Sequence, residues 1–261
     1  MPDAFGHNIH SVTVGEGAPT VMIHCMLGRH QAMLPLAKAI GGRATLIDLP
    51  GHGRSDAWDG KTEYQSLVAE AAQQCCAGPT HVIGHSFGAT AALRLAVENP
   101  ALVSRLTLIE PVFFAAAKGT AEFTAHMKAF RPFIAAMLMG DEERAAEIFN
   151  AQWSDSDWAE LSERRKAYLI QRIFLVVAGG AAIEEDVDGI TSEARLGALN
   201  IPVTLIRGAQ TQPVIKAVHD RLVARIPQAT DHEVANAGHM IALTHVADIA
   251  EIIRAGDQET G

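Results

Sequence analysis

The stretch that organises this sequence is Thr80-His-Val-Ile-Gly84-His85-Ser86-Phe87-Gly88-Ala-Thr-Ala-Ala-Leu-Arg-Leu-Ala96. A short β-branched run leads into a Gly-x-Ser-x-Gly pentapeptide, and a helical pattern follows without a break. Such a sharp turn from strand to helix holds its central serine in a strained conformation, and the flanking glycines let the two backbones pass closely. The positive end of the following helix also favours an anion near the serine. The pattern predicts that Ser86 is an activated nucleophile; the alternative is a chance pentapeptide.

On both sides of this stretch, short apolar runs alternate with longer helical patterns. This alternation is typical of a parallel sheet flanked by helices. The predicted strands are residues 20–25, 44–49, 80–84, 105–110, 202–207 and about 232–236. The predicted helices of this part are residues 33–40, 64–76, 89–98 and 246–254. The fold class is therefore α/β, with a mostly parallel, doubly wound sheet.

The alternation breaks after Pro111, and no convincing strand follows until about Asn200. Helical patterns occupy residues 121–139, 141–153 and 157–178. Amphipathic helices of this kind need a surface to cover. We therefore expect a helical cap at residues 113–199, inserted between two late strands, and one core domain formed by residues 1–112 and 200–261.

Composition excludes several functional classes. The 261 residues include 21 Lys and Arg against 30 Asp and Glu, a formal charge of −9 without a basic cluster, so we expect no nucleic-acid partner. The N-terminus lacks a basic region followed by an apolar run, and no apolar stretch approaches membrane-spanning length, which predicts a cytoplasmic protein with no membrane partner. Three cysteines, two of them adjacent, suit neither a disulfide framework nor a zinc site. The residues carry no signal for an oligomeric state.

A histidine late in the chain supplies the base that a serine nucleophile needs. Asn236-Ala237-Gly238-His239-Met240 follows the last predicted strand and precedes the last predicted helix. The chain has 12 histidines, and an isolated one is usually structural. Catalytic groups of open parallel sheets gather at the C-terminal ends of strands, and this position selects His239 as the general base.

Four further segments resemble one known family. They are Val21-Met-Ile-His24-Cys25-Met26-Leu27-Gly28, Asp48-Leu-Pro-Gly51-His52-Gly53-Arg54-Ser55-Asp56, Leu108-Ile-Glu110-Pro111 and Gly238-His239. With the serine pentapeptide, they make the chain resemble the α/β-hydrolase superfamily, in its capped subgroup with a serine nucleophile, over nearly its whole length. The resemblance implies that the sheet, the helical cap and a catalytic triad belong to one enzyme.

The resemblance also implies an oxyanion hole made by the backbone N–H groups of Met26 and Phe87. The chain departs from the family at Cys25, which stands where glycine usually follows His24. Both roles carry over, because a backbone donor does not depend on side-chain identity. Cys25 lacks an elbow, so we expect a small buried side chain in the pocket wall rather than a second nucleophile.

The acid of the family's usual triad is missing. Gly208-Ala-Gln210-Thr211-Gln212-Pro213 follows the strand predicted at residues 202–207 and contains no carboxylate. An acceptor on the far imidazole nitrogen is still needed, because it fixes the tautomer and stabilises the imidazolium. Glu110 is the best substitute, since some family members supply their acid from this strand end. The alternatives are that Glu110 only caps its loop, or that Gln210 or Gln212 holds His239 as a neutral acceptor.

These residues favour hydrolysis of an ester-type acyl bond through an acyl-enzyme, on a small to medium small-molecule substrate, without a cofactor or a metal. We expect substrate contacts from Cys25, His85, Phe113 and Met240. Other candidate pocket side chains are Phe114, Phe130, Phe133, Met137, Trp153 and Phe174. Because fold alone does not select a chemistry, thioesterase, lactonase, C–C bond hydrolase and cofactor-free lyase stay open. A non-catalytic binding protein would explain the missing acid.

Overall fold

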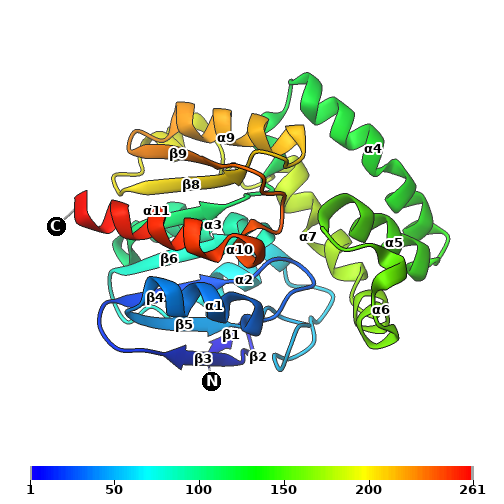
Figure 1. Ribbon diagram of the computed structural model, residues 1–261, viewed down its shortest axis with the longest axis horizontal. Helices are drawn as coiled ribbons and strands as arrows, with labels where there is room; N and C mark the ends of the chain where they lie inside the picture. Colours follow the sequence, from blue (N-terminus) through cyan, green and yellow to red (C-terminus); the bar gives the residue numbers. More distant parts are fainter. Residues whose placement is uncertain (1, 260–261) are drawn as a thin grey trace.

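A seven-stranded sheet forms the centre of the molecule (Figure 1). The computed structural model describes residues 2–259. The strand order is β3-β5-β4-β6-β7-β8-β9, and neighbours are parallel except for the antiparallel pair β3 and β5, so the predicted mostly parallel sheet is confirmed. The strands are β3 (Ser11–Val14), β4 (Pro19–Ile23), β5 (Arg43–Ile47), β6 (Thr80–His85), β7 (Val103–Ile109), β8 (Val203–Gly208) and β9 (Ala229–Val234). A separate hairpin joins β1 (Asp3–Ala4) and β2 (His7–Asn8).

Helices cover both faces of the sheet. One face carries α1 (His30–Ile40), the short α10 (Ile241–Thr244) and α11 (Val246–Glu259), and the other carries α2 (Tyr64–Gln73), α3 (Phe87–Glu98) and α9 (Pro213–Arg225). Side chains alternate between the two cores along each strand: Met22 packs on the first face, and its neighbours Val21 and Ile23 pack on the second. Burial on both faces explains why the strands read as continuous apolar runs.

The connection between β7 and β8, residues 110–202, consists of helices and loops, and we call it the helical connection. Its four longest helices, which lie between residues 121 and 185, stand to one side of the sheet in Figure 1. The helices of the helical connection are η2 (Phe114–Ala117), α4 (Ala121–Leu138), α5 (Glu142–Trp153), η3 (Trp158–Glu160), α6 (Glu163–Ile170), α7 (Phe174–Glu185) and α8 (Glu193–Gly197). Phe130, Phe133 and Trp153 join the same apolar cluster as α3, so the connection packs onto the sheet layer rather than standing apart.

The single helix predicted over residues 157–178 is wrong. The chain bends by 52° between α6 and α7. The amides of Arg172 and Ile173 bond to carbonyls three residues back, the tighter 3₁₀ pattern, while Arg172 Nε donates to the carbonyl of Gly51 at 3.0 Å. Within residues 2–259 no single helix is long and apolar enough to cross a membrane, and α6 with α7 meets that test only as this bent pair.

Two elements escape the sequence prediction for different reasons. Strand β3 is short, lies at the sheet edge and is only partly buried, so its apolar signal is weak. Helix α9 carries a usable signal, because Pro213 occupies its first turn and Val214, Val218 and Leu222 follow at helical spacing.

Gly179 controls how closely α7 approaches the turn that carries Ser86. A Cβ at this position would lie 2.4 Å from Cε2 of the buried Phe87 ring, whereas a Cβ on the adjacent Gly180 meets nothing closer than 4.0 Å. We expect Gly179→Ala to lower the free energy of unfolding by about 1–3 kcal/mol through overpacking. Gly180→Ala should raise it by up to about 1 kcal/mol, because alanine favours the helix.

Urea unfolding of both variants tests this packing, and Gly180→Ala is the matched control for helix propensity. Equal effects of the two substitutions would contradict the close approach of α7 to Phe87.

Candidate active site

Ser86 lies at the turn between β6 and α3. It has φ 57° and ψ −118°, and its amide donates to the carbonyl of Ile109 at 2.8 Å. A Cβ on Gly84 would lie 2.3 Å from the carbonyl oxygen of Gly88, and a Cβ on Gly88 would lie 2.4 Å from that of Ile23. The backbone therefore holds the serine in a strained conformation with positive φ, and the positions two residues before and two residues after it accept only glycine.

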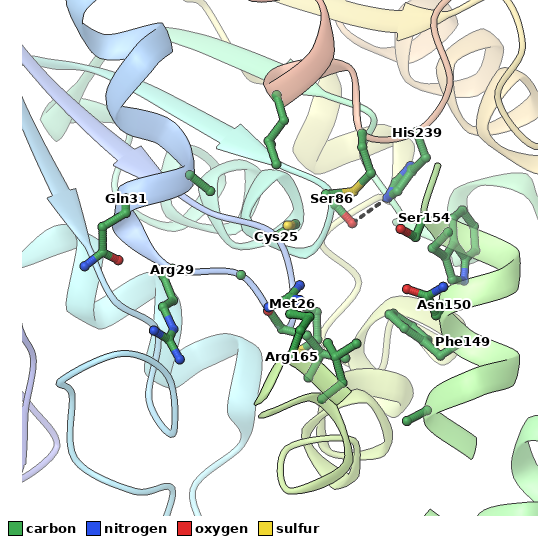
Figure 2. A pocket seen from close by; sticks show the side chains of 18 residues that line it. Cys25, Met26, Arg29, Gln31, Ser86, Phe149, Asn150, Ser154, Arg165 and His239 are labelled. Carbon is green, nitrogen blue, oxygen red and sulfur yellow. Dashed lines mark hydrogen bonds between the residues drawn. The ribbon is translucent and has the colours of Figure 1, made fainter. Parts of the chain in front are cut away.

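His239 connects Ser86 to Glu110. Its Nε2 lies 2.9 Å from Ser86 Oγ, and its Nδ1 lies 2.9 Å from Glu110 Oε2 (Figure 2 shows the contact with Ser86). A carboxylate only accepts, so Nδ1 carries the proton and Nε2 is left to accept from the serine hydroxyl. The Trp153 ring packs edge-on against the imidazole, with 4.7 Å between the ring centroids, and this contact restricts rotation of the imidazole. This is the arrangement that proton removal from a serine requires.

Glu110 is fully buried and held from several sides. Its Oε1 accepts from the backbone amide of Gly208 at 2.7 Å, and its Oε2 accepts from the Thr211 hydroxyl as well as from His239. The end of β8 and the loop after it therefore contribute donors that hold the carboxylate directly after β7. The side chain of Gln212 donates instead to the carbonyl of Gln152, and no described hydrogen bond joins Gln210 or Gln212 to His239, so the glutamine alternative is wrong.

Two residues that line the space next to Ser86 have backbone N–H groups without a described acceptor. Among residues 2–259, no acceptor is hydrogen-bonded to the N–H of Met26 or to the N–H of Phe87. Phe87 begins α3, where an amide has no partner within the helix. Met26 belongs to the loop after β4, and Met26 and Phe87 both line the space next to Ser86. These amides are available to an oxyanion.

Two neutral histidines fix the loop that carries Met26. His24 accepts from the amide of Leu49 at Nε2 (3.1 Å) and donates from Nδ1 to the carbonyl of Cys25 (2.7 Å). His52 accepts from the amide of Leu27 at 3.0 Å and donates to the carbonyl of Pro50 at 3.0 Å. Each ring must be neutral to accept and donate at once. Burial agrees, since it lowers the pKa of His24 to about 4 and that of His52 to about 3.

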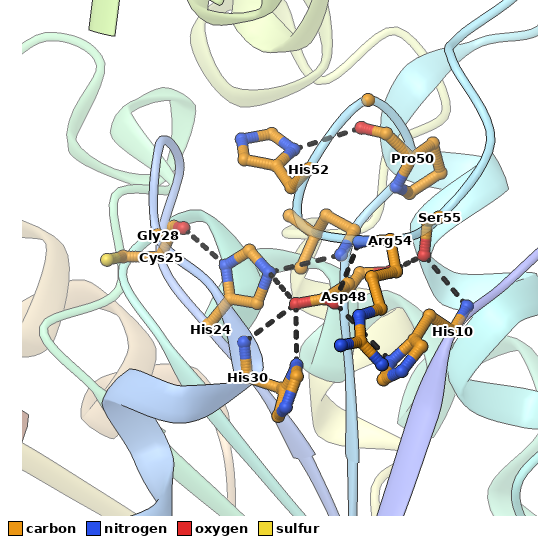
Figure 3. Close-up of polar contacts among 12 residues, drawn as sticks. His10, His24, Cys25, Gly28, His30, Asp48, Pro50, His52, Arg54 and Ser55 are labelled. Atoms are coloured by element: carbon orange, nitrogen blue, oxygen red, sulfur yellow. Dashed lines mark hydrogen bonds and ion pairs between the residues drawn. The ribbon is translucent and has the colours of Figure 1, made fainter. Parts of the chain in front are cut away.

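Asp48 joins these loops (Figure 3). Its carboxylate is fully buried and accepts from the amide of His30 (2.8 Å), from His30 Nδ1 (3.0 Å) and from the amide of Arg54 (3.1 Å). Burial alone would raise the pKa of Asp48, but these hydrogen bonds outweigh it and lower the pKa. Among described residues, His10, His30 and Asp48 have donor atoms within 4.8 Å of one another and could hold a metal ion. Because hydrogen bonds from His30 and Arg54 already satisfy its carboxylate, we interpret Asp48 as a residue that holds these loops together.

A cavity of about 330 Å³ opens over Ser86 and His239. Cys25 and Met240 line it, as predicted, together with Met26 and Trp153. Burial raises the pKa of the Cys25 thiol to about 11, so it stays protonated rather than acting as a second nucleophile. A second cavity of about 50 Å³ shares Ser86 with the first, and Phe114 and Phe130 line it.

His85 and Phe113, which the sequence predicts to contact substrate, line neither cavity that contains Ser86. Both are fully buried. His85 Nε2 lies 3.0 Å from the carbonyl of His239 and supports the histidine loop from behind. Successive side chains along a strand point to opposite faces of the sheet, so a position next to Ser86 in the sequence does not show whether His85 faces the cavity. Phe133, Met137 and Phe174 likewise lie away from the two cavities.

The sequence pattern also misses several cavity residues. They are Arg29, Gln31, Phe149, Asn150, Ser154 and Arg165. Arg165 lies in a charged run that reads as a solvated helix face, and only the packing of α6 over the loop after β4 turns it toward the cavity.

Comparisons with known proteins agree with this architecture. A family model described as the alpha/beta hydrolase family matches residues 20–252. Lipase LipV of Mycobacterium tuberculosis is 26% identical over 245 residues, which cover 87% of this chain and 85% of that protein. The (E)-2-((N-methylformamido)methylene)succinate hydrolase of Acinetobacter baylyi is 30% identical over 109 residues, covering 40% of this chain and 41% of that protein. The solved structure of a thermophilic esterase has a TM-score of 0.77 at 19% identity, covering 99% of this chain and 96% of the other.

Curated relatives at 30–33% identity match over 6–41% of their own length, so these matches span less than half of each relative. The family model, in contrast, spans most of this chain, and the solved neighbour shares its fold. The chain belongs to the α/β-hydrolase family, which confirms the resemblance drawn from its motifs.

Five histidines have their pKa values lowered by burial below the ordinary value of 6.5. They are His24 and His126, lowered to about 4, and His52, His81 and His85, lowered to about 3. The unfolded chain therefore binds more protons than the folded chain below pH 6.5. The stability that these neutral rings contribute is complete above pH 6.5, and it is lost as the pH falls toward 4 and then 3.

We expect the melting temperature to fall steeply between pH 7 and pH 5, because each such group changes stability by up to about 1.4 kcal/mol per pH unit. His126→Phe should flatten this dependence, since it removes one ring whose neighbours Phe114 and Phe130 are aromatic and whose Nε2 is buried without a partner. Thermal melts at several pH values measure both. A melting temperature that is constant from pH 7 to pH 5 would contradict burial of neutral rings.

Proposed function

We propose that the protein is a carboxylesterase-like serine hydrolase, with Ser86 as nucleophile, His239 as general base and Glu110 as the triad acid. The observation that carries this proposal is the unbroken hydrogen-bonded chain from Ser86 Oγ through His239 to Glu110, at 2.9 Å on each side of the imidazole. A relative named as a lipase supports ester-type substrates.

The reaction follows from the positions of these groups. Ser86 Oγ attacks the acyl carbon while His239 Nε2 takes the hydroxyl proton, and the amides of Met26 and Phe87 stabilise the oxyanion. The bond to the leaving alcohol then breaks, and the imidazolium returns its proton to that oxygen. Water attacks the acyl-enzyme with His239 again as base, which releases the acid and restores Ser86. Glu110 stays ionised throughout and stabilises the imidazolium.

Substituting Ser86 tests the nucleophile directly. We expect a fluorophosphonate probe to label the wild-type protein and not Ser86→Ala, because only an activated serine reacts. Hydrolysis of 4-nitrophenyl esters should fall by a factor on the order of 10⁴–10⁶ in the same variant. Ser104→Ala is the control, since that exposed serine belongs to β7 and lines neither cavity that contains Ser86.

Labelling and hydrolysis that survive Ser86→Ala would refute this mechanism. If the folded wild-type protein is not labelled at all, that result supports the alternative of a non-catalytic binding protein. A panel of 4-nitrophenyl esters and acyl thioesters of graded chain length then separates esterase from thioesterase chemistry.

A further inference from the structure

Among the described residues, the charged side chains that line the larger cavity over Ser86 are all arginines. Arg29 and Arg165 both line it, and no Asp or Glu is among the described residues that do so. This is unusual in a chain whose formal charge is −9 and whose acidic residues outnumber its basic ones. The charges that face the cavity therefore have the sign opposite to that of the whole protein.

Neither arginine has a carboxylate partner among residues 2–259. Arg29 Nε is buried without a hydrogen bond, and the only described hydrogen bond of the Arg165 guanidinium is a long one, 3.4 Å, to the carbonyl of Leu27. Arg94, in α3, shows the contrast: it contacts three acidic side chains at 2.9–3.2 Å. A guanidinium has five N–H donors, so most donors of Arg29 and Arg165 remain unused by the protein.

The protein holds these cations in place at an electrostatic cost. Arg29 stacks on the Tyr168 ring at 4.1 Å, Arg165 lies 5.3 Å from the same ring, and the Tyr168 hydroxyl donates to the carbonyl of Gly28 at 2.9 Å. Arg172 lies 4.1 Å from this ring as well. Burial, with a smaller contribution from the charge of Arg29, lowers the pKa of Arg165, as expected for a cation without a counter-charge.

The two cavities that contain Ser86 differ in the charged residues that line them. Helix α1 begins next to Arg29 and presents Gln31 and Ala32 to the same cavity, but the Asp48 carboxylate accepts from the amide of His30 and so already occupies the positive end of this helix. The smaller cavity is largely apolar, and Glu184 is among the residues that line it. A negatively charged substrate group is therefore directed to the arginine side of Ser86 (Figure 2 labels Arg29 and Arg165).

We propose that Arg165 and Arg29 form an anion subsite, so that the substrate is an ester carrying a carboxylate or phosphate group away from the bond that is cleaved. This proposal rests on the proposed hydrolase function and assigns its substrate class. A guanidinium suits either anion, because its planar fork matches the oxygen pairs of both.

Two pairs of esters test the charge and its side. The first pair is mono-4-nitrophenyl glutarate, which carries a negative charge on the acyl side, and its neutral partner 4-nitrophenyl butyrate. The second pair is 4-carboxyphenyl butyrate, which carries the charge on the leaving group, and its neutral partner phenyl butyrate. We expect kcat/KM for the anionic ester of at least one pair to exceed that of its neutral partner by about tenfold or more, since one hydrogen bond to a charged group supplies that factor.

Substitutions then assign the effect to the arginine. Arg165→Gln should lower the anionic-to-neutral ratio by about 10- to 100-fold, and Arg165→Lys should retain part of it, because the charge remains but the fork is lost. Arg144→Gln is the matched control: Arg144 belongs to α5, pairs with Glu147 and does not line the cavity, so the ratio should stay at its wild-type value.

Binding measured without turnover separates this proposal from the hydrolase function. Calorimetric titrations of the wild-type protein and Arg165→Gln with glutarate, inorganic phosphate and neutral glutaramide should show anion binding that the substitution weakens, and should identify the preferred anion.

A wild-type protein that is labelled at Ser86 and hydrolyses neutral esters, but shows ratios near one for both pairs, overturns the anion subsite and leaves the hydrolase function intact. Anion binding that depends on Arg165 in a protein whose Ser86 is not labelled supports the subsite and overturns the hydrolase function. Absence of binding by both glutarate and phosphate also overturns the subsite.

Discussion

The fully buried carboxylate of Glu110 is the group on which the site depends. A charge without water is costly unless hydrogen-bond donors surround it, and here they come from the amide of Gly208, the hydroxyl of Thr211 and the imidazole of His239. These donors belong to the end of β8 and to the loops after β8 and β9. The side chain that directly follows β7 therefore holds three neighbouring parts of the chain together and orients the histidine that contacts Ser86.

Sheet register explains why this arrangement forms without long-range adjustment. His85 is paired with Ile109, and Ile109 with Ile206, so Ser86 and Glu110 follow neighbouring strands at the same edge. Both residues have positive φ, 57° and 51°, which turns each side chain away from the direction of its strand. Strain at two adjacent strand ends is a cost that the surrounding packing must offset, and such strain is typical of functional positions.

The sequence predicted some residues of the site better than others. Motif context predicted the Ser86 turn, and it favoured Glu110 over Gln210 and Gln212 as the partner of His239, because parallel strands bring their C-terminal ends to one edge. The catalytic roles of these residues stay predictions. His85 lies next to Ser86 in the sequence but lines neither cavity, because sequence neighbours can face opposite sides. Arg165 was missed because an exposed helix face and a cavity wall have the same charged pattern. At the break between α6 and α7, Arg172 contacts Gly51, which is far away in sequence, so a local pattern does not reveal it.

The most direct test of the central claim is the rate at which a fluorophosphonate labels Glu110→Gln. This variant keeps the side-chain shape but removes the charge that stabilises the imidazolium, so the account predicts a labelling rate lower by a factor on the order of 10²–10⁴ in a protein that still unfolds cooperatively. Gln210→Ala should label at the wild-type rate, because the described partners of the His239 ring are Glu110 and Ser86. A Glu110→Gln protein that labels within a few-fold of the wild-type rate would contradict the claim and reduce Glu110 to a structural residue.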